Sequence, residues 1–263
     1  LSDTEELSEE TLTKIKNLIG TEIDPIKKAK LIYKFVQDRT RYVSIQLGIG
    51  GWKPMLAKDV DRLGYGDCKA LSNYTRVLLK SVGVDAYYTV IYGDKNIRNF
   101  QSDFVSMQGN HAVLILPTKD KNLVLECTSQ ITPFGFGGRF TDDRYALMVK
   151  DGKGELIKTI QYPEQTSLQS TKAKYSINEM GTLEGEMDIQ SKGIQYDYKY
   201  TLDLKSKTEI DDYYKAFQYF QKVVFPKRKT TEIPLGAVTL AKYIREHVSK
   251  NLVNDLLSSY KVI

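Results

Sequence analysis

The feature that most constrains this chain is a helix that begins just after two glycines, at Asp67-Cys68-Lys69. Four apolar residues recur at the spacing of a helix with one buried face: Leu71, Tyr74, Val77 and Leu78. Cys68 therefore lies at or next to the helix N-terminus. There the helix dipole and unpaired backbone N–H groups favour thiolate over thiol. The stretch predicts a cysteine nucleophile at the start of a helix that packs on a core.

A lone cysteine can instead be a small buried hydrophobe. Here the charges of Asp67 and Lys69 disfavour an apolar pocket around Cys68, and the glycines at 64 and 66 give the backbone room to turn tightly. Asp67 itself is open to two interpretations. It can polarise the candidate site, or it can cap the helix, as acidic residues at a helix start commonly do.

A histidine and a glutamate stand at one end of a predicted β-hairpin farther along the chain. Apolar runs at 112–116 and 123–126 are separated by a polar turn at 117–121, which is the pattern of two antiparallel strands. His111 opens the first strand and Glu126 closes the second, so both lie at the same end of the hairpin. Antiparallel neighbours can bring such side chains into contact.

These three residue types together can activate a thiol. A free cysteine has a reference pKa of about 8.5, so it needs a neighbouring imidazole to form a reactive ion pair at neutral pH. His111 would return the proton to a leaving amine, and Glu126 would fix the orientation of the imidazole. An oxyanion would need donors. The backbone N–H of Cys68 is one candidate, and Trp52 and Gln46 are candidate side chains.

Three short motifs resemble the core motifs of the bacterial transglutaminase-like superfamily, whose members are papain-like cysteine hydrolases. They are Tyr-Gly-Asp-Cys-Lys at 65–69, Asn-His-Ala-Val at 110–113 and Leu-Glu-Cys-Thr at 125–128, within a match over about 26–135. The resemblance implies that Cys68 is the nucleophile and His111 its partner. The third position is usually an aspartate followed by Pro-Thr. Here Glu126 is followed by Cys127-Thr128. Because glutamate is longer than aspartate, its backbone must lie farther from the imidazole for the carboxylate to meet the same ring nitrogen.

The expected fold class is α+β, with a transglutaminase-like core of helices packed on an antiparallel sheet and a mostly β part after it. The expected domains are the core at 1–162 and a β-rich C-terminal domain with one or two helices at 163–263. Besides the helix at Cys68 and the hairpin, the core should contain helices at 12–19, 25–40 and 57–63 and strands at 86–92, 145–149 and 155–159. The second part should contain strands at 173–177, 182–190 and 195–204 and helices at about 210–223 and 238–257.

Charge and composition argue against other classes of function. The net charge of +5 arises from 38 Lys and Arg interleaved with 33 Asp and Glu, which indicates a solvated surface and no nucleic-acid partner. No apolar run reaches the length of a membrane helix, so no membrane span is expected. Two cysteines and two scattered histidines predict no metal site and no cofactor. Cys127 is expected to be buried beside the site.

The resemblance implies a cysteine protease, amidase or acyltransferase. Such an enzyme would act on amide or peptide bonds of a protein or peptide through a Cys-His-Glu triad and a thioester. Hydrolysis is favoured over cross-linking, because water is the default acceptor and no amine pocket is visible. The alternative is an inactive transglutaminase-like fold that serves as a peptide- or glycan-binding or scaffold module.

The resemblance extends in domain order to multidomain bacterial proteins that carry a β-domain before a transglutaminase-like core. Those proteins are commonly exported. The resemblance therefore implies a periplasmic or cell-surface setting and a further domain N-terminal to this chain, although the sequence itself contains no signal peptide.

Overall fold

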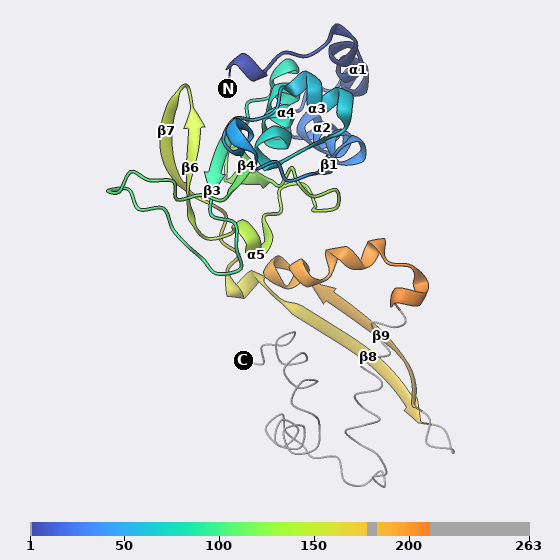
Figure 1. Ribbon diagram of the computed structural model, residues 1–263. Coiled ribbons are helices and arrows are strands. Elements are labelled where there is room, and N and C mark those ends of the chain that lie inside the picture. Colours follow the sequence, from blue (N-terminus) through green and yellow to red (C-terminus); the bar gives the residue numbers. More distant parts are fainter. Residues whose placement is uncertain (1, 178–182, 211–263) are drawn as a thin grey trace. The chain divides into compact units, whose positions relative to one another are not determined.

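The structure is a computed structural model that describes residues 2–177 and 183–210 (Figure 1). The chain divides after Tyr200. The residues up to that point form one compact unit, and residues 201–210 are the described part of the second. The domain boundary expected after residue 162 falls within the first unit and stays a prediction. Apart from residue 210, the helices expected at 210–223 and 238–257 lie outside the described residues.

Four helices of the first unit gather on one side of its sheet (Figure 1): α1 (Glu9–Ile19), α2 (Pro25–Arg39), α3 (Ala57–Leu63) and α4 (Cys68–Ser81). Local sequence explains where they begin and end. Asp24 caps α2 by accepting a hydrogen bond from the backbone N–H of Ile26 at 2.8 Å. Pro25 then occupies the first helical position, for which its fixed φ is suited. Gly64 ends α3 with a φ of +69°, a left-handed conformation that favours glycine.

A five-stranded antiparallel sheet has the strand order β5-β4-β3-β6-β7. Its strands are β3 (Tyr87–Ile91), β4 (His111–Pro117), β5 (Asn122–Leu125), β6 (Tyr145–Lys150) and β7 (Lys153–Lys158). The two hairpins β4–β5 and β6–β7 flank β3 at the centre of the sheet. The chain is thus an α+β protein with helices and an antiparallel sheet, and the hairpin predicted from His111 to Glu126 forms, with Leu114 opposite Leu125.

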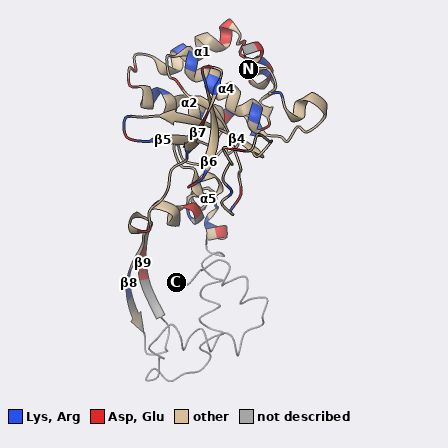
Figure 2. Cartoon of the chain, turned by 90° about the vertical axis from the view of Figure 1, so that its left-hand side faces the viewer, with Lys and Arg blue, Asp and Glu red and all other residues tan. Residues whose placement is uncertain are grey.

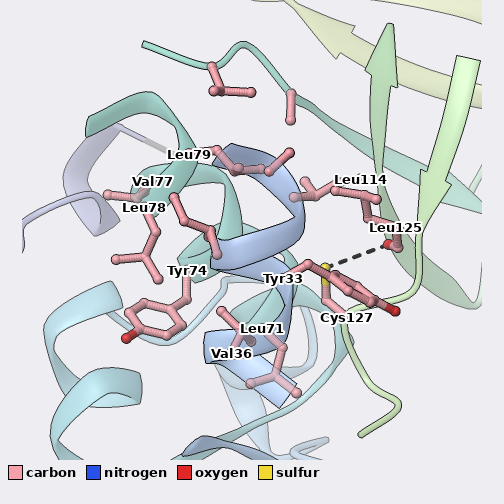
Figure 3. Close-up of a cluster of buried hydrophobic side chains, with 14 of the residues drawn as sticks. Tyr33, Val36, Leu71, Tyr74, Val77, Leu78, Leu79, Leu114, Leu125 and Cys127 are labelled. Carbon is pink, nitrogen blue, oxygen red and sulfur yellow. Dashed lines mark hydrogen bonds between the residues drawn. The ribbon is translucent and has the colours of Figure 1, made fainter. Parts of the chain in front are cut away.

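The main hydrophobic core lies between α4 and one face of the sheet. Figure 3 shows Leu71, Tyr74 and Leu78 of α4 together with Leu114 and Leu125 of the sheet. Each of these side chains is at most 1% exposed. Full burial of one such side chain contributes about 1.5–3 kcal/mol to folding. The apolar spacing of 71–78 therefore marks the face of α4 that packs on this core, and this burial anchors the helix that begins at Cys68. The helix is buried more widely than the spacing predicts, because its polar residues Ser72, Asn73 and Thr75 are buried as well.

The opposite face of the sheet has a smaller buried cluster of its own, which includes Ile91, Val113, Ile115, Val124 and Met148. Because β4 contributes residues to both clusters, it is buried on both faces. A strand buried on both faces reads as a continuous apolar run rather than as an alternating pattern. This explains the unbroken run at 112–116.

Beyond residue 162 a short 3₁₀ helix, η3 (Glu164–Thr166), precedes a two-stranded antiparallel sheet of β8 (Gln169–Ile177) and β9 (Leu183–Ser191). The strand expected at 195–204 is wrong, because η4 (Gly193–Tyr198) and η5 (Tyr200–Leu204) are 3₁₀-helical. The Tyr196 and Tyr200 rings both contact the Phe136 ring, with centroid distances of 5.5 and 6.0 Å. In an extended strand, residues four apart would be separated by about 13 Å. A helical turn brings both tyrosines to one partner.

Charged side chains of both signs are spread over the helices and strands of the described chain (Figure 2). Many form pairs, such as Lys58 with Glu6 and Arg76 with Glu5. This distribution agrees with the interleaved charges of the sequence. Among the described helices, none combines the length and the apolar character needed to cross a bilayer.

Candidate active site

Cys68 is the first residue of α4 and is partly exposed. Two short parallel strands, β1 (Arg41–Tyr42) and β2 (Tyr65–Gly66), fix the chain just before it. A Cβ atom on Gly66 would come within 2.8 Å of the Ala70 Cβ, so glycine allows β2 to approach the first turn of α4. This strand, glycine and helix sequence holds the thiol at the helix N-terminus, as the sequence predicts.

Asp67 caps α4. Its Oδ1 accepts a hydrogen bond from the backbone N–H of Ala70 at 2.9 Å, and its Oδ2 accepts one from the Lys69 ammonium group. The Asp67 and Lys69 side chains are only 4% and 13% exposed, so this ion pair lies largely out of water beside the thiol. Of the two interpretations of Asp67, the geometry favours the cap.

His111 and Glu126 form a close pair at the same end of the hairpin. The Nε2 atom of His111 lies 2.8 Å from Oε2 of Glu126, and both side chains are 10% exposed. The other carboxylate oxygen, Oε1, accepts hydrogen bonds from the backbone N–H of Thr128, at 3.0 Å, and from its hydroxyl. Because Nε2 is engaged by the carboxylate, the Nδ1 side of the ring is left for a hydrogen bond with Cys68.

One hydrogen bond links the helix of Cys68 to the strand of His111. The hydroxyl of Ser72, one turn after Cys68, donates to the carbonyl of Ala112, which directly follows His111, at 3.1 Å. Ser72 is fully buried. This contact fixes the position of α4 along β4, and therefore of the thiol relative to the imidazole. The sequence analysis did not predict this contact. A serine among the apolar residues of α4 does indicate a buried hydroxyl that needs a hydrogen-bond partner.

The charges of the pair reinforce one another. Burial alone would lower the pKa of His111. The negative charge of Glu126 and the hydrogen bonds with Cys68 and Glu126 outweigh burial and raise that pKa to about 10. Burial would likewise raise the pKa of Glu126, but the charge and hydrogen bond of His111 and the two Thr128 donors lower it. At neutral pH a protonated His111 and an ionised Glu126 therefore lie beside Cys68.

The end of α2 fixes the backbone around Glu126. The Tyr33 hydroxyl donates to the carbonyls of Glu126 and Thr132, at 2.8 and 3.1 Å. The Gln37 amide group donates to the carbonyls of Ser129 and Thr132, at 3.0 and 2.9 Å. These bonds bind the segment after β5 to the helical layer, so the Glu126 carboxylate is supported from the backbone as well as from its own hydrogen bonds.

An aromatic ring and a glycine lie against His111. Phe140, in the short helix α5 (Gly138–Thr141), contacts the imidazole edge to face with a centroid distance of 5.3 Å. A Cβ atom on Gly93 would lie 2.6 Å from the Phe140 ring and 3.1 Å from the His111 Cβ. Asn110 binds the backbone N–H and carbonyl of Gly93, at 2.7 and 3.1 Å. No spacing in the sequence pointed to Phe140 or Gly93.

The predicted oxyanion side chains lie on the exposed segment between β1 and α3. The Gln46 amide group donates to the Ser44 hydroxyl at 3.3 Å, and Trp52, which follows η2 (Gly48–Gly51), is 62% exposed. In the described part of the chain, neither side chain has a hydrogen bond to Cys68, His111 or Glu126. The structure therefore brings together the first three predicted site residues and not these two, whose role stays a prediction.

Cys127 is a free, buried thiol, as the sequence predicts. Figure 3 shows its sulfur in the hydrophobic core, where it contacts the Leu125 carbonyl at 3.5 Å. Burial raises its pKa to about 12 and outweighs the hydrogen bonds of Thr75 and Ser72, which lower it. A thiol of this kind is inert at neutral pH. Cys127 is thus buried in the core, whereas Cys68 is partly exposed at the start of α4.

No protein-family model matches the chain, and no curated protein matches its sequence. A candidate protease from Parabacteroides distasonis, known from its crystal structure, is 14% identical with a TM-score of 0.45, over 62% of this chain and 30% of that one. A candidate cysteine protease from Cytophaga hutchinsonii is 14% identical with a TM-score of 0.33, over 48% of this chain and 41% of that one. The match thus spans less than half the length of either protein. Likenesses of this extent assign no activity.

Proposed function

We propose that the chain is a transglutaminase-like cysteine hydrolase that cleaves amide bonds of peptides or proteins through Cys68, His111 and Glu126. The observation that carries the proposal is the engaged imidazole. Its Nε2 is 2.8 Å from a buried carboxylate, which leaves the other ring nitrogen for the Cys68 thiol at the helix N-terminus, and Cys68 contributes to the raised pKa of the ring. A thiol, an imidazole and a carboxylate in this order can generate and use a thiolate.

In the first half of the reaction the Cys68 sulfur, as a thiolate beside the protonated His111, attacks the carbonyl carbon of the amide. The negative charge then develops on the carbonyl oxygen. The Asp67 carboxylate engages the N–H of Ala70 and the Asp67 carbonyl that of Leu71, which leaves the Cys68 N–H for this oxyanion. The C–N bond breaks as His111 gives its proton to the leaving amine, and a thioester to Cys68 remains.

In the second half, water attacks the thioester carbonyl while His111 takes a proton from it. The carbon–sulfur bond breaks, the carboxylic acid leaves, and the proton on His111 restores the starting pair with the Cys68 thiolate. Glu126 stays ionised throughout and keeps Nε2 of His111 engaged, so the same ring atom always faces the sulfur. Transfer to an amine would follow the same path with the amine in place of water.

The proposal is tested by incubating a pool of peptide amides with the wild-type chain and with the variants Cys68→Ala and Cys127→Ala. We expect amine release from the wild type and from Cys127→Ala but not from Cys68→Ala. Addition of hydroxylamine should trap the acyl group as a hydroxamate. Absence of both release and trapping in the wild type would argue against hydrolysis and for the binding-module alternative.

A periplasmic or cell-surface setting and a further N-terminal domain are part of the same proposal. They depend on the resemblance of the three motifs to those of exported multidomain proteins. Detection of the full-length protein in a periplasmic or surface fraction of its own cells would support this setting. Detection only in the cytoplasmic fraction would contradict it.

A further inference from the structure

We propose that Arg144 is a positioning residue for His111, acting through the Phe140 ring and Gly93. Its guanidinium fixes the two backbone segments that hold Phe140 and Gly93 against the imidazole. This inference rests on the proposed function, because it assigns Arg144 a role in the same site. Within the described part of the chain, Arg144 has no hydrogen bond or ion pair with Cys68 or Glu126, so it is not a catalytic residue.

Arg144 directly precedes β6 and is 0% exposed, so its guanidinium is buried. Its Nη1 donates to the carbonyls of Tyr92 and Asp94, at 2.7 and 2.9 Å. Its Nε donates to the carbonyl of Asp142 at 2.8 Å, and its Nη2 to that of Arg139 at 3.0 Å. One side chain thus holds four carbonyls from two separate segments of the chain.

Those two segments are the ones that contact His111. Residues 92–94 contain Gly93, and residues 139–142 contain Phe140. A direct bond joins them as well, from the backbone N–H of Asp94 to the Phe140 carbonyl at 3.1 Å. Gly93 lies against both the Phe140 ring and His111, so the three form one packed group. A shift of either segment would therefore move the ring that contacts the imidazole.

Arginine suits this position for a physical reason. A guanidinium has five N–H donors in a rigid plane, whereas a lysine ammonium has three donors on a flexible chain and cannot hold four carbonyls in this arrangement. The buried charge is balanced by the Asp142 carboxylate, with Oδ1 3.6 Å from Nη2. Burial of a charge is costly unless it is paired and hydrogen-bonded, as it is here.

Two titratable groups act on the imidazole itself. They are Glu126, at the end of β5, and Cys68, on α4. Phe140, on α5, is neutral. The charged neighbours of Arg144 are Asp142, Asp94 and Asp143. Arg144 therefore has no direct contact through which to change the charge of His111, and its influence must pass through the packing of Phe140 and Gly93.

The test compares the pH dependence of Cys68 alkylation by iodoacetamide in the wild type, Arg144→Lys and Phe140→Ala. In both variants the alkylation rate at pH 6.5 should fall by about three- to tenfold, which matches the net contribution of one ordinary hydrogen bond. Phe140 is 46% exposed, so Phe140→Ala is expected to fold even where Arg144→Lys does not. A double variant should lose no more than the larger single loss.

Arg76→Lys is the matched control, because the Arg76 guanidinium is also largely buried but pairs with Glu5 and Asn73, away from His111. It should leave the alkylation profile unchanged. The inference is overturned if His111→Ala changes the profile while Phe140→Ala, or a folded Arg144→Lys, retains that of the wild type. If His111→Ala itself leaves the profile unchanged, the proposed function fails, and this inference fails with it.

Discussion

At the scale of single residues, the account depends on the bond between His111 and Glu126. The transglutaminase-like pattern has an aspartate where this chain has Glu126, and the longer side chain still meets the imidazole, at 2.8 Å. Thr128 occupies the other carboxylate oxygen through its backbone and its hydroxyl. Both oxygens of Glu126 are therefore engaged. We infer that a glutamate here can perform the orienting role of an aspartate.

Glu126→Gln tests this role. Glutamine keeps the shape of the side chain, so the fold should be retained, while the pKa of His111 should fall because the carboxylate that raises it is gone. Turnover should decrease about a hundredfold. Steady-state kinetics and an NMR titration of His111 measure the two effects. The exposed Glu164 provides the control, since Glu164→Gln should change neither; unchanged turnover in Glu126→Gln would remove Glu126 from the catalytic set.

The same variant has a defined pH signature. A raised pKa of His111 contributes stability that is complete below the unfolded value of 6.5 and lost as the pH rises through about 10. A lowered pKa of Glu126 contributes stability present above 4.5 and lost on acidification. The difference in unfolding free energy between wild type and Glu126→Gln should therefore be largest between pH 4.5 and 6.5. Urea unfolding across this range measures it.

The sequence predicted three of the site residues because each stands where a pattern changes. Cys68 follows two glycines and precedes a helical stripe, and His111 and Glu126 bound the strands of a hairpin. The supporting residues carry no such signal. Arg144 lies in a segment of glycines, aromatics and polar residues, and its partners are backbone carbonyls. Only the fold brings those carbonyls together.

At the scale of elements, α4 and β4 position the reactive groups. Their apolar residues form the core that fixes both elements, and Ser72 ties one to the other beside the site. The period of α4 was readable because its apolar residues recur at helical spacing, although buried polar residues such as Ser72 and Asn73 stand between them. The role of β4 was harder to see, because burial on both faces removes the alternation that marks a strand.

The start of α4 depends on Asp67. Asp67→Ala should reduce the unfolding free energy by more than the roughly 1 kcal/mol of a helix cap, because it also leaves the buried Lys69 ammonium without its partner. Asp67→Asn keeps an acceptor for the cap, so its unfolding free energy should lie between those of Asp67→Ala and the wild type. Asp24→Ala, which removes a cap but no buried ion pair, is the control in urea unfolding. Equal losses for Asp67→Ala and Asp24→Ala would contradict this account.

At the scale of the whole molecule, the part of the chain after residue 162 contacts the segment 136–140, which carries Phe140 beside His111. The Phe136 ring packs on Tyr162, Tyr196 and Tyr200. Asp197 accepts a hydrogen bond from the backbone N–H of Arg139 at 3.4 Å. Such long-range contacts have no local signature in the sequence. Sequence alone therefore predicted the strands on either side better than the contacts across this boundary.

A chain that ends at residue 162 should consequently melt at a lower temperature than one that ends at residue 204. Removal of Tyr196 and Tyr200 exposes one side of Phe136 and so loses apolar burial. Phe136→Ala should lower the melting temperature by less in the shorter chain, because the ring has already lost these partners there. Thermal unfolding of the four proteins measures both effects. Equal melting temperatures would instead support an independent core at 1–162.

The central claim, an activated Cys68–His111 pair, is tested most directly by the rate of Cys68 alkylation by iodoacetamide between pH 5.5 and 8, read by peptide mass spectrometry in the wild type and His111→Ala. Buried Cys127 is the internal reference. We expect rapid modification of Cys68 at pH 6.5 and a decrease of about tenfold or more in His111→Ala. Equal rates in the two proteins, or a Cys68 as slow as Cys127, would contradict the claim.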